Sequence, residues 1–211
     1  ILELSLRTVI REGKMKVTDD ILEEAFETFN SGEKKIWSAE TLERVARHES
    51  GHALVCRHGG EMPSYITVVS RGNHGGYMQH GDNENKAIYT KEELLARIRT
   101  SLGGRAAEIV YYGADEGIST GASGDLNTAT RIAENYLLAY GMDEGFGLST
   151  AQPDSAELRA AVNKILGEQL AMTVDIPSRN RETADKLSAA LIEKNHLAGD
   201  EIKAFFSKPL V

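Results

Sequence analysis

The sequence predicts a mainly α-helical protein, built as an array of helices with one small β-hairpin. Most of the 211 residues lie in stretches whose apolar positions recur every three or four residues, which is typical of amphipathic helices. Only residues 64–71 (SYITVVSR) have the β-branched and aromatic composition of a strand. With 41% hydrophobic residues, 27% charged residues and 4 prolines, the chain is expected to form a packed core.

The N-terminal part is predicted to hold a helix and a linker ahead of a second, longer helix. The first helix begins at Asp20, which can cap it together with Glu23 three residues on. Its apolar positions have helical spacing: Ile21, Leu22, Ala25, Phe26 and Phe29. Gly32 and the charged residues 33–35 then predict a linker. The second helix is expected from Ser38, as its cap, to His58, where Gly59 and Gly60 stop it.

The hairpin and the remaining helices follow. The strand at 64–71 is expected to pair with a short return strand at 75–80, and a polar loop over 81–86 comes next. Thr90, with Glu93 at the capping-box position, starts a helix that Gly103 and Gly104 are expected to interrupt. The later segments are a glycine- and acid-rich loop over 113–124 and helices over 125–141, 155–176 and 180–195, with a kink or break near Pro177.

Charge and cysteine content exclude several classes of protein. The net charge of −8 and the pI near 5.3 give no electrostatic reason to expect a nucleic-acid partner. The single cysteine, Cys56, excludes an internal disulfide and a multi-cysteine zinc finger, and it suits a reducing compartment. Apolar runs are far shorter than the ~20 residues of a membrane span, so the chain itself is expected to be soluble.

The pentapeptide His48-Glu49-Ser50-Gly51-His52 is an H-E-x-x-H motif inside the predicted second helix. Residues four apart lie on one helix face, so both imidazoles can reach one cation, and zinc suits such nitrogen ligands. Glu49 lies beside this face, where a carboxylate can act as general base on a water. Gly51 costs about 1 kcal/mol of helix propensity relative to alanine, which indicates close packing or a constraint from the metal site.

A catalytic zinc usually takes three protein ligands and a water, so a third ligand has to come from elsewhere. His58 lies well off the ligand face and is expected at the surface, and Cys56 lies a further turn along and is interpreted as a packing thiol. Two carboxylates are candidates. Asp125 is favoured because a helix N-terminus holds a carboxylate ionised, although it could simply cap that helix. Glu108 could equally be the helical partner of Arg105.

Three separated motifs together resemble the peptidase domain of the FtsH-type AAA+ zinc proteases, and the resemblance covers nearly the whole chain. Residues 45–55 (VARHESGHALV) resemble the family's metal helix. Residues 101–113 (SLGGRAAEIVYYG) resemble its glycine-arginine helix, and residues 118–130 (ISTGASGDLNTAT) its third-ligand segment. Two later stretches, 138–147 and 180–202, also resemble the family's helices.

The resemblance implies a zincin-type helical fold in which zinc is held by His48, His52 and Asp125, with Glu49 as the catalytic base. Glu108 then becomes an outer or structural residue. The resemblance also implies two parts: residues 1–37 as the end of an AAA+ lid with a linker, and residues 38–211 as the peptidase domain. It further implies polypeptide substrates, a hexamer, and ATP used only by a motor domain absent from this chain.

The remaining expectations concern ATP binding, location and departures from the family's pattern. No ATP-binding P-loop is present, because Thr8 stands where the first glycine before Gly13-Lys14 would be. By resemblance, the parent protein works on the cytoplasmic side of the inner membrane, with an anchor in N-terminal segments not present here. Ser50 in place of alanine, the polar segment 72–86 and Pro177 depart from the family's pattern.

Two other functions stay open at the level of sequence. One is a non-proteolytic oligomerisation module in which a metal with four protein ligands is structural. The other is a metal-dependent hydrolase of small peptides that works without a motor. The presence of Glu49 favours the protease, because a structural site has no use for a base.

Overall fold

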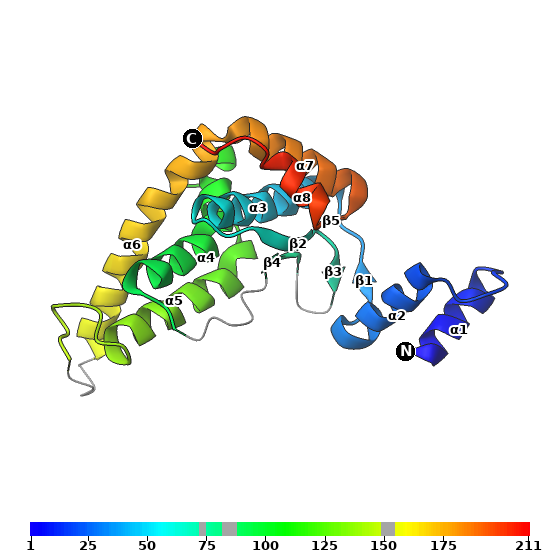
Figure 1. The fold of residues 1–211 in the computed structure, drawn as a ribbon, viewed down its shortest axis with the longest axis horizontal. Helices are drawn as coiled ribbons and strands as arrows, with labels where there is room; N and C mark the ends of the chain where they lie inside the picture. The colour runs from blue at the N-terminus through cyan, green and yellow to red at the C-terminus, as the bar shows by residue number, and fades with distance from the viewer. Residues whose placement is uncertain (72–74, 82–87, 149–154) are drawn as a thin grey trace.

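A computed structural model describes residues 1–71, 75–81, 88–148 and 155–211. It confirms the predicted class: a helical protein with a small antiparallel sheet (Figure 1). The helices are α1 Leu2–Arg11, α2 Asp19–Ser31, α3 Ala39–His58, α4 Lys91–Tyr112, α5 Ser123–Leu138, α6 Ser155–Arg179, α7 Arg181–Lys194 and α8 Asp200–Phe205, with a 3-10 turn η1 Thr120–Ala122. The strands are β1 Lys34–Lys35, β2 Pro63–Thr67, β3 Ser70–Arg71, β4 Tyr77–His80 and β5 His196–Ala198.

The helix starts follow capping chemistry. Ser38 caps α3, accepting from the amide of Thr41, as predicted. Thr90 and Glu93 form the predicted capping box of α4. The prediction for α2 was wrong: Thr18 is its cap, and Asp20 lies inside the first turn. Helix α1 was not predicted.

The prediction that the two glycines would interrupt α4 was also wrong. Helix α4 runs unbroken through Gly103 and Gly104, because α3 crosses it there at backbone contact. A Cβ atom on Gly51 would lie 2.3 Å from the carbonyl oxygen of Gly103. The break predicted near Pro177 is present three residues further on: α6 includes Pro177 and ends at Arg179, and α7 begins after Asn180.

The predicted hairpin is present, but the sheet is larger than expected. Strands β2 and β4 pair antiparallel, with Ile66 opposite Met78, and β5 adds a third strand on the other side of β2. The predicted strand 64–71 is split after Thr67, whose hydroxyl accepts from the amide of Val69. Its last residues form β3, which pairs with β1 in the segment predicted as a linker.

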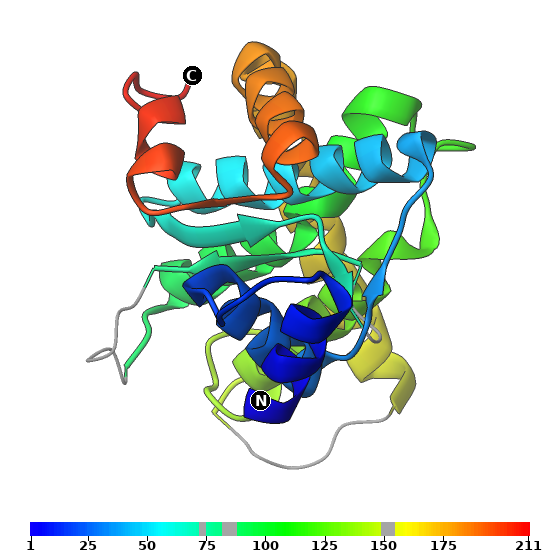
Figure 2. The same ribbon diagram turned by 90° about the vertical axis from the view of Figure 1, so that its right-hand side faces the viewer.

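Two apolar clusters hold the helical array together. One joins α3 to β2, α7, β5 and α8, and includes Leu54, Ile66 and Leu187. The other joins α4, α5 and α6 and includes Ile98 and Leu137. Helix α3 lies along one face of the sheet, and α7 packs on the side of α3 that faces away from the sheet (Figure 2). The site-bearing helix is therefore packed on several sides.

Helices α1 and α2 stand apart from the rest of the molecule and are connected to it through β1 (Figure 1). Arg71 of β3 joins α2 to the sheet by donating to Glu24, Thr28 and the carbonyl of Gly32. The pair exposes several large apolar side chains, namely Leu2, Leu6, Ile10, Phe26 and Phe29.

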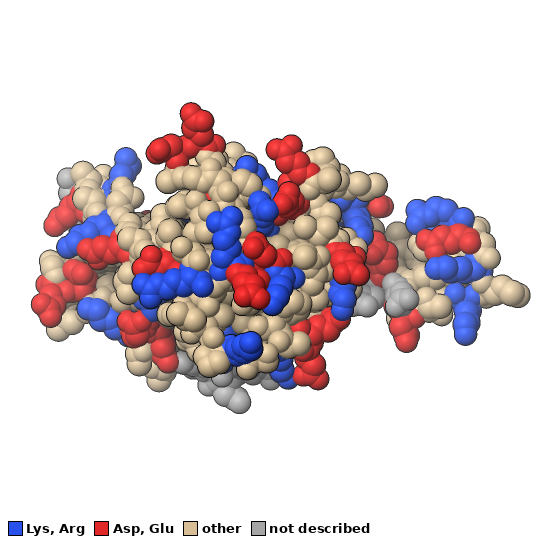
Figure 3. Space-filling model, turned by 90° about the horizontal axis from the view of Figure 1, so that it is seen from above, with Lys and Arg blue, Asp and Glu red and all other residues tan. Residues whose placement is uncertain are grey.

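One face of the molecule carries charges of both signs. On the face seen in Figure 3, acidic and basic side chains intermingle, and neither sign forms a continuous patch among the described residues. Among the helices described, none is both long enough and apolar enough to cross a membrane.

Candidate active site

Helix α3 presents two buried imidazoles to one point. His48 and His52 are one helical turn apart, and their Nε2 atoms lie 3.1 Å from each other. Each ring is oriented from behind through Nδ1, which lies 3.2 Å from Oε1 of Glu108 in His48 and 2.7 Å from the carbonyl oxygen of Thr100 in His52. Because Nδ1 donates to these oxygens, both Nε2 atoms are directed at the shared point.

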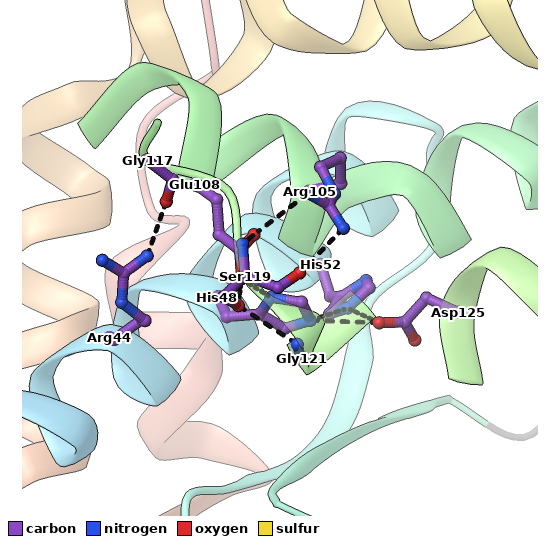
Figure 4. A network of polar contacts seen from close by, with 9 residues as sticks. All are labelled: Arg44, His48, His52, Arg105, Glu108, Gly117, Ser119, Gly121 and Asp125. Atoms are coloured by element: carbon purple, nitrogen blue, oxygen red, sulfur yellow. Dashed lines mark hydrogen bonds and ion pairs between the residues drawn. The ribbon is translucent and has the colours of Figure 1, made fainter. Parts of the chain in front are cut away.

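The third group at this point is Asp125, in the first turn of α5. Its Oδ2 lies 3.0 Å from Nε2 of His48 and 3.3 Å from Nε2 of His52. Figure 4 shows the carboxylate reaching from α5 toward the two rings, while Glu108 approaches His48 from the opposite side. The structure thus brings together His48, His52 and Asp125 and places Glu108 behind His48.

These three atoms fit a divalent cation. Nitrogen and oxygen ligands at ~2.0–2.1 Å from a tetrahedral zinc lie ~3.3 Å from one another. The three observed separations are 3.0, 3.1 and 3.3 Å. Two imidazoles and one carboxylate, with both histidines hydrogen-bonded through Nδ1, form a donor set that zinc prefers, with an open side left for water.

The electrostatics of the cluster also favour a positive charge at the point where these three side chains meet. Burial disfavours the charged form of His48, but hydrogen bonds to Asp125 and Glu108 outweigh it and raise its pKa to about 10. The pKa of His52 is raised in the same way, burial being outweighed by the hydrogen bond to Asp125. The pKa of Asp125 is lowered despite its burial, because both histidines donate to it. A divalent cation can supply the charge that protons otherwise supply.

Glu49 is the buried carboxylate beside this cluster. Its side chain is 5% exposed, and its Oε2 has no hydrogen-bond partner among the described residues. Burial raises the pKa of Glu49, while the adjacent histidines oppose that shift. A cavity of about 770 Å³ opens beside Glu49, lined in part by Val45, Tyr77 and Asp125. An unpartnered carboxylate in a cavity is available to a water or a substrate.

Ser119, in the loop before α5, supports Glu108, a role that the sequence did not predict. Ser119 donates to Glu108 twice, from its amide at 2.9 Å and from its hydroxyl at 2.5 Å. These bonds and the one to His48 overcome burial and lower the pKa of Glu108 to about 2. Arg105 lies 3.6 Å from Glu108, as expected of its helical partner, and donates to the carbonyl of Ser119. Arg44 donates to the carbonyl of Gly117 in the same loop.

The role of Gly104 was also missed from the sequence. A Cβ atom at this position would lie 2.2 Å from Nε2 of His48, so the absence of a side chain makes room for the ring. Gly76 plays a similar part near Glu49, whose Oε1 would be 3.0 Å from a Cβ there. The available signal was a glycine pair within an otherwise strong helical pattern, which indicates close approach as well as a break.

The other residues considered lie outside the cluster. His58 is exposed, as expected. Cys56 is buried, with its sulfur 3.8 Å from Nδ1 of His80. Tyr77 and His80 line the cavity from β4; Tyr77 is 47% exposed. His80 is held by Glu61 at 2.8 Å.

Comparison with known proteins identifies the family. The chain is 31% identical to the ATP-dependent zinc metalloprotease FTSH 6, chloroplastic, of Arabidopsis thaliana, over 94% of this chain and 32% of that protein. It is 33% identical to the ATP-dependent zinc metalloprotease FtsH of Mycoplasmopsis pulmonis, over 95% of this chain and 31% of that protein. The chain spans about a third of the length of the curated relatives it matches. Because residues 35–161, which include the whole cluster, match the family model of peptidase family M41, the chain belongs to that family.

Proposed function

We propose that this chain is the zinc-dependent endopeptidase domain of an ATP-dependent protease. The observation that carries the proposal is the meeting of His48, His52 and Asp125 within 3.3 Å, beside the unpartnered carboxylate of Glu49. Peptidase family M41 and the names of the relatives support the same chemistry.

The residues divide the work of peptide hydrolysis. His48, His52 and Asp125 would hold the zinc, with Glu108 fixing the ring of His48 from behind. When bound, zinc supplies a Lewis acid that activates water and polarises the scissile carbonyl. Glu49 accepts the proton of the attacking water and then delivers it to the leaving amine, a sequence that a buried carboxylate with a raised pKa can perform.

The substrate would lie extended along β4. This strand is at the edge of the three-stranded sheet, and its residues line the cavity together with Gly75 and Gly76. Pairing through backbone hydrogen bonds requires an unfolded segment but little particular sequence. This mode suits a protease of unfolded or membrane-associated polypeptides.

The wider context is proposed from the family resemblance. Residues 1–37 form the end of an AAA+ lid and its linker, and residues 38–211 form the peptidase domain. A motor elsewhere in the parent chain uses ATP to feed substrates into a hexamer, anchored at the cytoplasmic side of the inner membrane by N-terminal segments. The exposed apolar residues of α1 and α2 are consistent with a neighbouring lid.

Three variants test the assignments with casein, an unstructured substrate that needs no unfolding, and with zinc content measured by mass spectrometry. Glu49→Gln should keep zinc and lose at least about 100-fold in turnover, because the base is gone. Asp125→Ala should lose zinc. Glu108→Gln should weaken zinc binding by about 10–100-fold through the loosened ring of His48.

The exposed Glu40→Gln in the same helix is the matched control and should change neither property. Undiminished turnover in Glu49→Gln would refute the base assignment. If Asp125→Ala retained zinc and Glu108→Gln lost it entirely, Glu108 would be the third ligand in place of Asp125. A fourth protein ligand in a zinc-loaded structure would support the oligomerisation module instead.

A further inference from the structure

A second group of metal-ligand side chains lies at the C-terminal end of α3. It consists of Cys56 on the helix, Glu61 just after it and His80 at the end of β4. Cys56 is one turn beyond His52, so the group is separate from the three residues of the active-site cluster. Neither the proposed chemistry nor the family comparison gives it a role.

The three ligand atoms are close enough for one ion. The sulfur of Cys56 lies 3.8 Å from Nδ1 of His80, and Oε2 of Glu61 lies 2.8 Å from the same nitrogen. All three atoms lie within 4.8 Å of one another. Bonds of about 2.3 Å to sulfur and 2.0 Å to nitrogen put these two ligands ~3.6 Å apart around a tetrahedral zinc. A small rotation of the Glu61 carboxylate would open the remaining gap.

The backbone positions of these residues are fixed without contacts from the three ligand side chains. Helix α3 ends in a Schellman turn, in which the amide of Glu61 donates to the carbonyl of Cys56 and that of Gly60 to Arg57. Gly60 supplies the required positive φ of 91°. On the other side, His80 is paired with Pro63, and its carbonyl accepts from the hydroxyl of Ser64. The three ligands therefore come from two fixed segments.

We propose that Cys56, Glu61 and His80 form a second, thiolate-containing site for a divalent metal ion such as zinc. The donor set joins a soft thiolate and a borderline imidazole to one hard carboxylate, and the thiolate and imidazole favour zinc or cobalt over magnesium or calcium. An ion can reach it from solvent, because the side chains of His80 and Glu61 are each 39% exposed while the thiol lies beneath them. A fourth position stays open to water. The bound ion would tie the end of α3 to β4.

Binding is a proton exchange at sulfur. Burial, and then the charge of Glu61, raise the pKa of the Cys56 thiol to about 12, so the free site holds a neutral thiol. A coordinating ion takes the sulfur as thiolate, and the displaced proton leaves to solvent. Nδ1 of His80 also gives up the proton that it donates to Glu61, so that the neutral ring carries its one proton on Nε2. No electron transfer is involved.

Cobalt is the probe that separates the two sites, because only this one contains sulfur. We expect Co²⁺ added to the metal-free full chain to bind in two equivalents, one of which gives the near-ultraviolet charge-transfer band of a cobalt–thiolate bond. Cys56→Ser should abolish the band and leave the other equivalent. His80→Ala should raise the cobalt concentration at half-saturation of the band at least about tenfold, since even outer-shell losses cost that much.

Two control variants make the outcomes distinct. Asp125→Ala should remove the equivalent without sulfur and keep the band, so failure of the active-site assignment would be seen separately. His58→Ala, an exposed histidine two residues from Cys56, should change nothing. Absence of the band in the wild-type chain would overturn the proposal. An undiminished band in His80→Ala would overturn it as well, because cobalt would then be bound by the thiol alone.

Discussion

At the scale of single residues, the site depends on what surrounds each ligand as much as on the ligands. His48 is fixed from three directions, by Glu108 at Nδ1, by Asp125 at Nε2 and by the bare backbone of Gly104 against its ring. Ser119 in turn fixes Glu108. A ring held in this way loses little freedom when it binds a metal, which is the basis of a preorganised site.

Gly104→Ala should remove metal binding while the chain still folds. The added methyl group would lie 2.2 Å from Nε2 of His48 and so displace the ring from the ligand position. Zinc content and circular dichroism together check this. Gly124→Ala, whose Cβ would meet nothing within 4 Å, is the control and should bind zinc normally. Normal zinc content in Gly104→Ala would show that His48 is not a ligand.

The Cys56 thiol should be nearly unreactive in the metal-free native chain. Its pKa of about 12 is raised from 9.0, chiefly by burial, so at pH 8 it holds on the order of 10³ times less thiolate than an ordinary thiol. The sign for stability follows: the protonated thiol's contribution is complete below pH 9 and is lost as the pH rises toward 12. Alkylation of Cys56, followed by mass spectrometry, should be slow in buffer and fast in urea. Equal rates would show that the folded chain does not raise the pKa of this thiol.

At the scale of elements, the crossing of α3 and α4 determines where the ligands can be. Gly51 and Gly103 meet backbone to backbone, which brings Glu108 on α4 within reach of His48 on α3. Helix α5 then completes the site by directing its first turn at the same point.

Gly51→Ala should destabilise the fold strongly. Its Cβ would lie 2.3 Å from the carbonyl oxygen of Gly103 and 2.6 Å from Cβ of Ala107, so the two helices would have to separate. We expect a loss of at least about 2 kcal/mol of unfolding free energy, measured by urea denaturation. Gly167→Ala in α6 meets nothing and should instead stabilise by up to about 1 kcal/mol. An unchanged free energy of unfolding in Gly51→Ala would mean that α3 and α4 are not in backbone contact.

The sequence was informative where the signal is local. Periodicity and caps predicted α3 and α4, and the H-E-x-x-H spacing predicted that His48 and His52 share a face. Whatever depends on long-range packing was missed. The glycine pair of α4 was interpreted as a break, because the helix that crosses it is 50 residues away in the chain. Strands β1 and β5 are two and three residues long and carry no pattern of their own.

The same distinction applies to the site. Asp125 and Glu108 could both be named as candidates, but periodicity cannot order them, since each lies on a helix whose position is set by tertiary contacts. The structure puts Asp125 at the two Nε2 atoms and Glu108 at Nδ1 of His48. Their roles as ligand and support stay predictions until zinc is measured in the variants.

At the scale of the whole molecule, the N-terminal helical pair is joined to the rest of the structure at a few points. Arg71 is 5% exposed and donates to Glu24 at 2.7 Å and to Thr28 at 3.0 Å. Trp37, between β1 and α3, donates to the carbonyl of Val68 and also lines the cavity.

Arg71→Ala should release α2 from the sheet without unfolding the rest of the molecule. Losing hydrogen bonds made by a buried charged group should cost the docking about 1.5–3 kcal/mol. Hydrogen exchange should therefore become faster in α2 and stay unchanged in α7. Arg7→Ala removes only an exposed ion pair within α1 and should leave both rates as they are. Unchanged exchange in α2 of Arg71→Ala would show that other contacts dock the pair.

Trp37 places the segment that carries the N-terminal pair at the wall of the active-site cavity. The indole of Trp37 lines the cavity directly after the segment that carries α1 and α2. Gly75, which leads into β4, lies against the indole. The two histidines depend on a different contact, the crossing of α3 and α4, so the connection to α1 and α2 reaches the wall of the cavity but not the metal ligands.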